Sequence, residues 1–271
     1  MSFSLVPGFA QRYPKDGEDN LSPNPDDRHS RLDRESVPTD DFSVRPDRAS
    51  LLIESCCTTL DQALSAQARG AGRIELCVDL SVGGITPPRD LIREVVAQLS
   101  IPVNVLIRPS VMPGPDRASG FSARDFVYDA AALRQMMDDI GYCKSVGAAG
   151  VVIGALTPEG AIDLPAMRRL IAAARGTAGS RPLPVTFHRA FDVCSEDPFT
   201  ALDKIIALGC TRLLSSGQAP TAWDGRNLLT LLVRRAGRRL IVMPGCGVTP
   251  DNLSALAAVT RATEIHGTRI P

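Results

Sequence analysis

Eight short apolar runs alternate with seven amphipathic stretches along most of this chain, and this alternation restricts its fold more than any other feature. A strand, a helix and a second parallel strand form a unit whose helix covers one face of the sheet. Several amphipathic stretches end on glycine, at Gly70, Gly147 and Gly209, as helices commonly do. The pattern predicts a (β/α)8 TIM-type barrel. A doubly wound open sheet is the alternative, but it does not need eight evenly spaced strands.

The expected elements follow directly from these runs. The expected strands are Leu51–Ser55, Arg73–Cys77, Pro102–Arg108, Gly150–Gly154, Pro184–Arg189, Arg212–Ser216, Arg239–Met243 and Ala262–His266. The expected helices are Thr58–Arg69, Pro88–Leu99, Asp129–Val146, Leu164–Ala174, Pro198–Leu208, Ala222–Arg235 and Pro250–Ala258. The chain stops at Pro271, so the barrel is expected to lack its final helix. The N-terminal segment or a partner subunit, as in a homodimer, would then cover the first and eighth strands.

Two segments do not fit the barrel pattern. Residues 1–48 are rich in Pro, Asp, Arg and Ser without apolar periodicity, which predicts a disordered tail. The folded domain is therefore expected to be a C-terminally truncated barrel over residues 49–271. Residues 109–124 form a Gly/Pro/Ser-rich insertion after the third strand, either a lid or a mobile loop.

Composition excludes several classes of partner. The chain has 30 basic and 30 acidic residues and no basic stripe with interleaved aromatics, which argues against nucleic-acid binding. No apolar run is long enough to cross a membrane, and the start does not resemble a secretory signal, so a cytoplasmic protein is expected. The seven cysteines are an odd number spread over strands and helices, which indicates reduced thiols.

Alternation of side chains along each strand predicts which polar residues share the barrel interior. Glu54 shares one face of its strand with Cys56, and Glu75 shares one with Cys77. Further polar residues lie near the C-terminal ends of other strands: Arg108, Thr186, His188, Glu264 and His266. Active sites of such barrels lie at this end. Carboxylates, imidazoles, a guanidinium and thiols are therefore expected together at one mouth.

The segment from Pro184 to Asp192 has several ionisable residues close together in the sequence. An apolar strand ends in His188 and Arg189 and is followed by Asp192. One hypothesis is an enzyme that acts on a small, perhaps phosphorylated, metabolite. His188 would be its general acid or base, assisted by Glu75 or Glu54. Arg108 or Arg189 would hold an anion, and Asp192 belongs to the same polar group.

Two glycine turns predict an anion site. Ser216 and Gly217 follow the sixth strand, and Gly245 and Gly247 follow the seventh. Backbone amides in such turns can bind phosphate, and barrels often do so after their last strands. A glycine turn that only tightens a loop is the structural alternative.

Structural roles also compete with the metal-binding ones. A free cysteine is most often a small buried hydrophobe. No Cys-x-x-Cys or His-x-x-x-His spacing occurs, which disfavours a structural zinc site. The helical pair Met136 and Met137 is interpreted as packing rather than as a copper site.

Taken together, the motifs resemble the CutC copper homeostasis family in the same order from Leu51 to His266. They are Glu54–Cys56, Arg73–Cys77, Gly83–Pro87, Ile107–Pro109, Val185–Asp192, Ser215–Gly217 and Thr263–His266. The resemblance implies a cytosolic barrel associated with copper tolerance. It also implies that Cys56 and Cys77 are the proposed copper ligands. Two thiolates suit soft Cu(I).

The chain departs from this family at three places. The insertion begins at Ser110, Cys246 stands where glycine is usual, and the chain ends after His266 without a further helix. Three hypotheses stay open. They are a copper-binding barrel with a copper ion as its partner, an enzyme with a small-molecule ligand, and a truncated, weakly folded product. The resemblance favours the first, whereas the second is chemically the more natural use of such a barrel.

Overall fold

A computed structural model of the chain describes residues 51–109, 122–177, 179–268 and 270–271. The predicted disordered tail over residues 1–48 and the central part of the 109–124 insertion lie outside the described residues. The described residues lie within the compact unit Ser43–Pro271.

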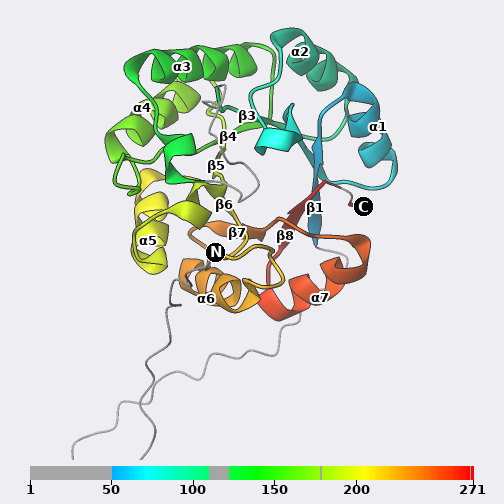
Figure 1. The fold of residues 1–271 in the computed structure, drawn as a ribbon. Coiled ribbons are helices and arrows are strands. Elements are labelled where there is room, and N and C mark those ends of the chain that lie inside the picture. Colours follow the sequence, from blue (N-terminus) through cyan, green and yellow to red (C-terminus); the bar gives the residue numbers. More distant parts are fainter. Residues whose placement is uncertain (1–50, 110–121, 178, 269) are drawn as a thin grey trace, which may run out of the picture. The chain divides into compact units, whose positions relative to one another are not determined.

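Eight parallel strands form the ring at the centre of this unit (Figure 1). They are β1 (Leu52–Cys57), β2 (Arg73–Leu76), β3 (Val103–Leu106), β4 (Gly150–Ile153), β5 (Val185–Phe187), β6 (Arg212–Ser215), β7 (Ile241–Pro244) and β8 (Glu264–Gly267). The hydrogen-bonded order runs from β7 through β6, β5, β4, β3, β2 and β1 to β8. Strands β7 and β8 lie side by side where the ring closes (Figure 1). The predicted (β/α)8 barrel is confirmed.

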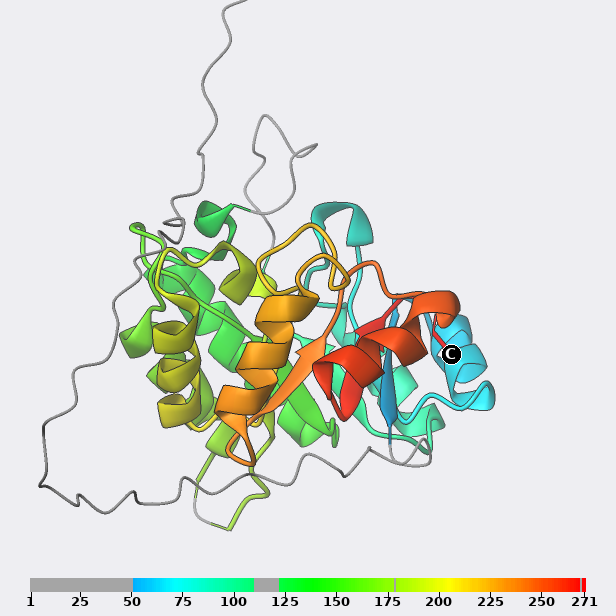
Figure 2. The same ribbon diagram turned by 90° about the horizontal axis from the view of Figure 1, so that it is seen from below.

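Seven α-helices of the described residues surround the strands, and Figure 2 shows helices along the outside of the ring. They are α1 (Leu60–Ala68), α2 (Arg89–Gln98), α3 (Ala130–Ser145), α4 (Leu164–Arg175), α5 (Pro198–Leu208), α6 (Arg226–Ala236) and α7 (Pro250–Thr260). Asp129, Asp163 and Asp197 begin three of them, because each carboxylate accepts a hydrogen bond from a first-turn amide. None of the described helices is long and apolar enough to span a membrane.

Three short 3-10 helices were not expected from the sequence. They are η2 (Leu80–Val82), η4 (Ala123–Phe126) and η5 (Arg189–Val193). Each is too short to show an amphipathic period in the sequence. Arg189 is the first residue of η5, and β5 ends at Phe187, so the fifth strand is shorter than predicted. These three turns all lie on loops that follow strands, where they shape the mouth.

No helix follows β8 within the described residues, as predicted. Ile270 is fully buried, and the Arg69 side chain donates a hydrogen bond of 2.9 Å to the carbonyl of Pro271. Figure 1 accordingly places the C-terminus beside β1 and α1. Ile265, on the outward face of β8, is fully buried, whereas Ile53 on β1 is half-buried. The outer face of β8 is therefore covered, whereas that of β1 is only partly so.

Two apolar clusters divide the core. The large one fills the space between strands and helices, where the outward-facing residues of the strands meet the buried helix residues. The small one lies inside the barrel and consists of Cys56, Cys77, Leu106 and Val152. Parallel pairing sets Glu54 beside Arg73 and His266, and sets Cys56 beside Glu75. Neighbours in register point to the same face, so these side chains share the interior.

Candidate functional site at the barrel mouth

A buried ion network lies beneath the mouth. The Arg73 guanidinium donates to both Glu54 and Glu264, and the two carboxylates are 0 % and 6 % exposed. Arg212 binds the Glu264 carboxylate with two hydrogen bonds, of 2.7 and 3.1 Å. Asn104 adds a hydrogen bond to Glu54 at 3.3 Å. Arg73 was not among the predicted site residues, although the alternation that places Glu75 and Cys77 inside also places Arg73 there.

His266 connects this network to the mouth. Its Nδ1 lies 2.8 Å from Glu54 Oε1 and 3.9 Å from Glu75 Oε2. Burial alone would lower the pKa of His266, but the Glu75 charge and the Glu54 hydrogen bond raise it above its ordinary value. Burial likewise raises the pKa of Glu54, but the His266 hydrogen bond and the Arg73 charge outweigh it and bring that pKa to about 2. Glu54 is thus an ionised carboxylate that orients His266.

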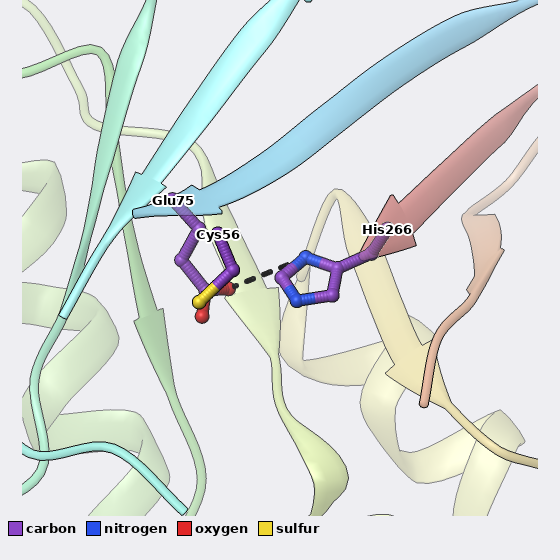
Figure 3. Close-up of side chains that lie close together, drawn as sticks. All are labelled: Cys56, Glu75 and His266. Atoms are coloured by element: carbon purple, nitrogen blue, oxygen red, sulfur yellow. Dashed lines mark ion pairs between the residues drawn. The ribbon is translucent and has the colours of Figure 1, made fainter. Parts of the chain in front are cut away.

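Glu75 differs from Glu54 although both are buried. Burial raises the pKa of Glu75 to about 7, opposed by the His266 charge and reinforced by the Glu54 charge. Its Oε2 is buried and makes no hydrogen bond within the described residues. Figure 3 shows the Glu75 carboxylate next to the Cys56 sulfur, with the His266 imidazole facing both. Glu75 is therefore the carboxyl group of this set that changes protonation near neutral pH.

Cys56 and Cys77 are neighbours, with their sulfur atoms 3.4 Å apart. The Cys77 contact raises the pKa of Cys56 well above its ordinary value, and burial and the Glu75 charge raise it further. Gly84, from the predicted Gly83–Pro87 motif, lies beside Cys77 with a φ of +89°. A Cβ at Gly84 would lie 2.9 Å from Leu106 Cδ2, so a side chain there would displace Leu106, and the left-handed backbone also favours glycine.

A possible ligand set for a metal ion extends beyond the two thiols. The Cys56 sulfur, a Glu75 oxygen and a His266 nitrogen all lie within 4.8 Å of one another (Figure 3). Thiolate and imidazole are donors that copper accepts, and the neighbouring thiol of Cys77 adds a second sulfur. The residues therefore fit a soft metal ion. The sequence placed His266 at the mouth without giving it this role.

His188 and Arg108 form another wall of the mouth. Arg108 is 2 % exposed, and its Nη1 donates to the carbonyls of Val82 and Gly84. The Phe126 ring lies 4.9 Å from both the Arg108 guanidinium and the His188 ring. Burial and the Arg108 charge lower the pKa of His188 to about 3. His188 is therefore a neutral imidazole at physiological pH.

Asp192 supports the loops rather than facing the cavity. It pairs with Arg189 at 2.8 Å and accepts a 2.6 Å hydrogen bond from the Ser215 hydroxyl and another from the Ser216 amide. The predicted anion site is partly occupied by these internal bonds. Gly217 donates to the Ser215 hydroxyl and Gly245 to the Ser215 carbonyl. Of the four residues of the predicted anion site, Gly247 lines the cavity. The prediction of an anion site therefore depends on the glycine turn after β7.

A cavity of about 490 Å³ unites these groups at the mouth. Seven of its lining residues lie at the C-terminal end of a strand or directly after it: Cys56, Glu75, Cys77, Arg108, His188, Arg189 and His266. Cys246 also lines it, with a left-handed φ of +86°. Glycine adopts this conformation without cost, which fits the glycine that the resemblance implies at this position. The volume lies in the range of small-molecule sites.

Residues 51–271 match the model of the CutC family. The chain belongs to the CutC family. A CutC protein of Histophilus somni (strain 2336) is 45 % identical over 214 residues, which cover 79 % of this chain and 80 % of that protein. A CutC protein of Xanthomonas campestris pv. campestris (strain 8004) is 46 % identical over 214 residues, covering 79 % and 81 %.

Solved structures agree with this assignment. CutC from Streptococcus agalactiae, named as a copper homeostasis protein, has a TM-score of 0.71 at 32 % identity and covers 82 % of this chain and all of that one. A phosphonopyruvate hydrolase complex has a TM-score of 0.53 at 14 % identity and covers 80 % of this chain and 75 % of its own, a likeness of fold alone. The CutC resemblance predicted from the motifs is confirmed.

Proposed function

We propose that this CutC protein binds copper as Cu(I) through Cys56 and Cys77 and thereby serves copper homeostasis in the cytosol. The observation that carries the proposal is the 3.4 Å separation of two thiols at the mouth cavity. Soft thiolate ligands select Cu(I) over the harder divalent ions. His266 and Glu75 lie beside the pair and supply nitrogen and oxygen donors. A reducing compartment suits the seven cysteines, all of which are free thiols.

A Cu(I) competition titration against a chelator tests this proposal. The double variant Cys56→Ser/Cys77→Ser is expected to lose at least roughly a hundredfold in Cu(I) affinity, because hydroxyl groups are poor ligands for a soft ion. Cys143→Ser/Cys210→Ser is the matched control, since it removes two buried thiols that do not line the cavity. Equal affinity in the wild type and the Cys56/Cys77 variant would contradict the proposal.

An enzyme acting on a small metabolite is the second candidate. The observation that favours it is the His188 Nε2 atom, which is buried and makes no hydrogen bond within the described residues. In this candidate His188 donates a hydrogen bond to the substrate and does not accept a proton, because its pKa is about 3. Such an enzyme requires an organic ligand with an acceptor atom that hydrogen bonds to His188 Nε2.

The predicted homodimer is part of the proposal and not of the observed fold. Its basis is that no described helix follows β8 and that Ile53, on the outer face of β1, is only half-buried. Sedimentation equilibrium of the full chain distinguishes a monomer from a dimer.

A further inference from the structure

His188 carries a hydrogen-bond donor that the protein itself leaves unused. Its Nδ1 accepts a 3.2 Å hydrogen bond from the amide of Ala190, so Nδ1 holds a lone pair. In a neutral imidazole the proton is then on Nε2. That Nε2 is buried and makes no hydrogen bond within the described residues. An unsatisfied buried donor is unfavourable, and a ligand with an acceptor atom would remove this cost.

The surroundings of His188 fix the direction of its ring. Phe126 packs against it at 4.9 Å with an interplanar angle of 52°. Gly154 lies on another side, and a Cβ at Gly154 would be 2.6 Å from both His188 Cε1 and Nδ1. A side chain at position 154 would therefore displace the imidazole. The ring is held between an aromatic face and a glycine, and its donor cannot turn to another partner without disrupting this packing.

Two guanidinium groups lie on this wall of the cavity, and Asp192 pairs with one of them, that of Arg189. Arg108 and Arg189 line the same cavity as His188. Two carbonyls hold the Arg108 guanidinium in place, and Asp192 and Ser216 hold that of Arg189. Guanidinium groups and an imidazole N–H are all donors, and donors converging on a cavity select an oxygen anion. The wall is thus chemically different from the thiol side formed by Cys56 and Cys77.

We propose that Arg108, His188 and Arg189 form an oxyanion subsite, which binds the carboxylate or phosphate group of a small organic anion. The His188 Nε2–H donates to one oxygen of that group, and the two arginines provide the positive charge. The cavity of about 490 Å³ has room for the rest of a small metabolite. This subsite is independent of the proposed copper site, because none of its three residues is a thiol.

Nitrogen NMR of the metal-free full chain tests the subsite with inorganic phosphate and pyruvate as probes and glycerol as the uncharged control. Histidine-labelled protein is expected to show His188 protonated at Nε2 before any addition. Phosphate or pyruvate, but not glycerol, should then shift the Nε2 signal saturably. Which anion binds more tightly identifies the phosphate or the carboxylate as the preferred group.

Variants separate the subsite from general attraction of anions. His188→Phe should weaken anion binding by roughly tenfold or more, since hydrogen bonds to charged groups contribute about 1.5–3 kcal/mol. Arg93→Met removes an exposed cation on α2 and should leave the affinity unchanged. If His188→Phe does not fold, the wild-type spectrum decides alone. A proton on Nδ1, no saturable shift with either anion, or equal binding by folded His188→Phe would overturn the proposal.

Discussion

Arg73→Met is expected to destabilise the barrel by about 3–5 kcal/mol, the range measured when one partner of a buried ion pair is removed. Arg73 contacts both Glu54 and Glu264, and its side chain is only 4 % exposed. Without it, Arg212 still neutralises Glu264, but Glu54 keeps only His266 as a cationic partner. Chemical denaturation of the metal-free chain measures the change in the free energy of unfolding.

Arg93→Met is the matched control for this experiment. Arg93 pairs with Asp90 at the surface, where the two side chains are 64 % and 86 % exposed. Such pairs contribute at most about 1 kcal/mol, so the control should be nearly as stable as the wild type. The added change Glu54→Gln should restore part of the stability of Arg73→Met, since it removes the buried carboxylate that Arg73 neutralises in the wild type. Equal stability of the two methionine variants would contradict a structural role for the network.

Glu75→Gln is expected to stabilise the metal-free protein by about 3 kcal/mol at pH 8 and to change little at pH 5. The pKa of Glu75 is about 7 in the folded chain, against an ordinary value of 4.5. Between these two values the folded state retains a proton that the unfolded chain has lost. The unfolding free energy of the wild type therefore falls as pH rises through this window, and glutamine, which stays neutral, removes that loss.

Thermal and denaturant unfolding at several pH values between 5 and 8 measures this effect. Glu94→Gln on the exposed face of α2 is the control and should follow the wild type at every pH. A stability difference between wild type and Glu75→Gln that does not grow with pH would show that Glu75 is ionised throughout. In that case the neighbouring His266 charge, and not burial, would decide its protonation.

Alternation in the sequence was enough to predict the architecture, because each buried strand and each amphipathic helix has its own period. The same reasoning placed Glu54, Glu75 and His266 inside, and their register in β1, β2 and β8 brings them together. The 3-10 helices were missed because segments as short as Leu80–Val82 carry no period. The predicted end of β5 was too late in the chain because the short helix η5, which begins at Arg189, also carries no period.

The chemistry of individual residues was harder to predict than their location. Two carboxyl groups on neighbouring strands, Glu54 and Glu75, have opposite pKa shifts because only Glu54 contacts Arg73 and hydrogen bonds to His266. The sequence suggested His188 as an acid or base, and in the structure burial and the charge of Arg108 lower its pKa to about 3 while its Nδ1 accepts a hydrogen bond from Ala190. Such contacts depend on atoms far apart in the sequence or on side-chain direction, and neither is visible in a residue pattern.

X-ray absorption at the copper edge tests the central claim most directly, because it identifies the atoms bound to the metal. The chain loaded with one Cu(I) should show two sulfur ligands, from Cys56 and Cys77, whose sulfur atoms lie 3.4 Å apart. The Cys56→Ser/Cys77→Ser variant should lose both. A spectrum of nitrogen and oxygen ligands alone in the wild type, or unchanged sulfur ligation in the variant, would contradict the assignment of copper to this site.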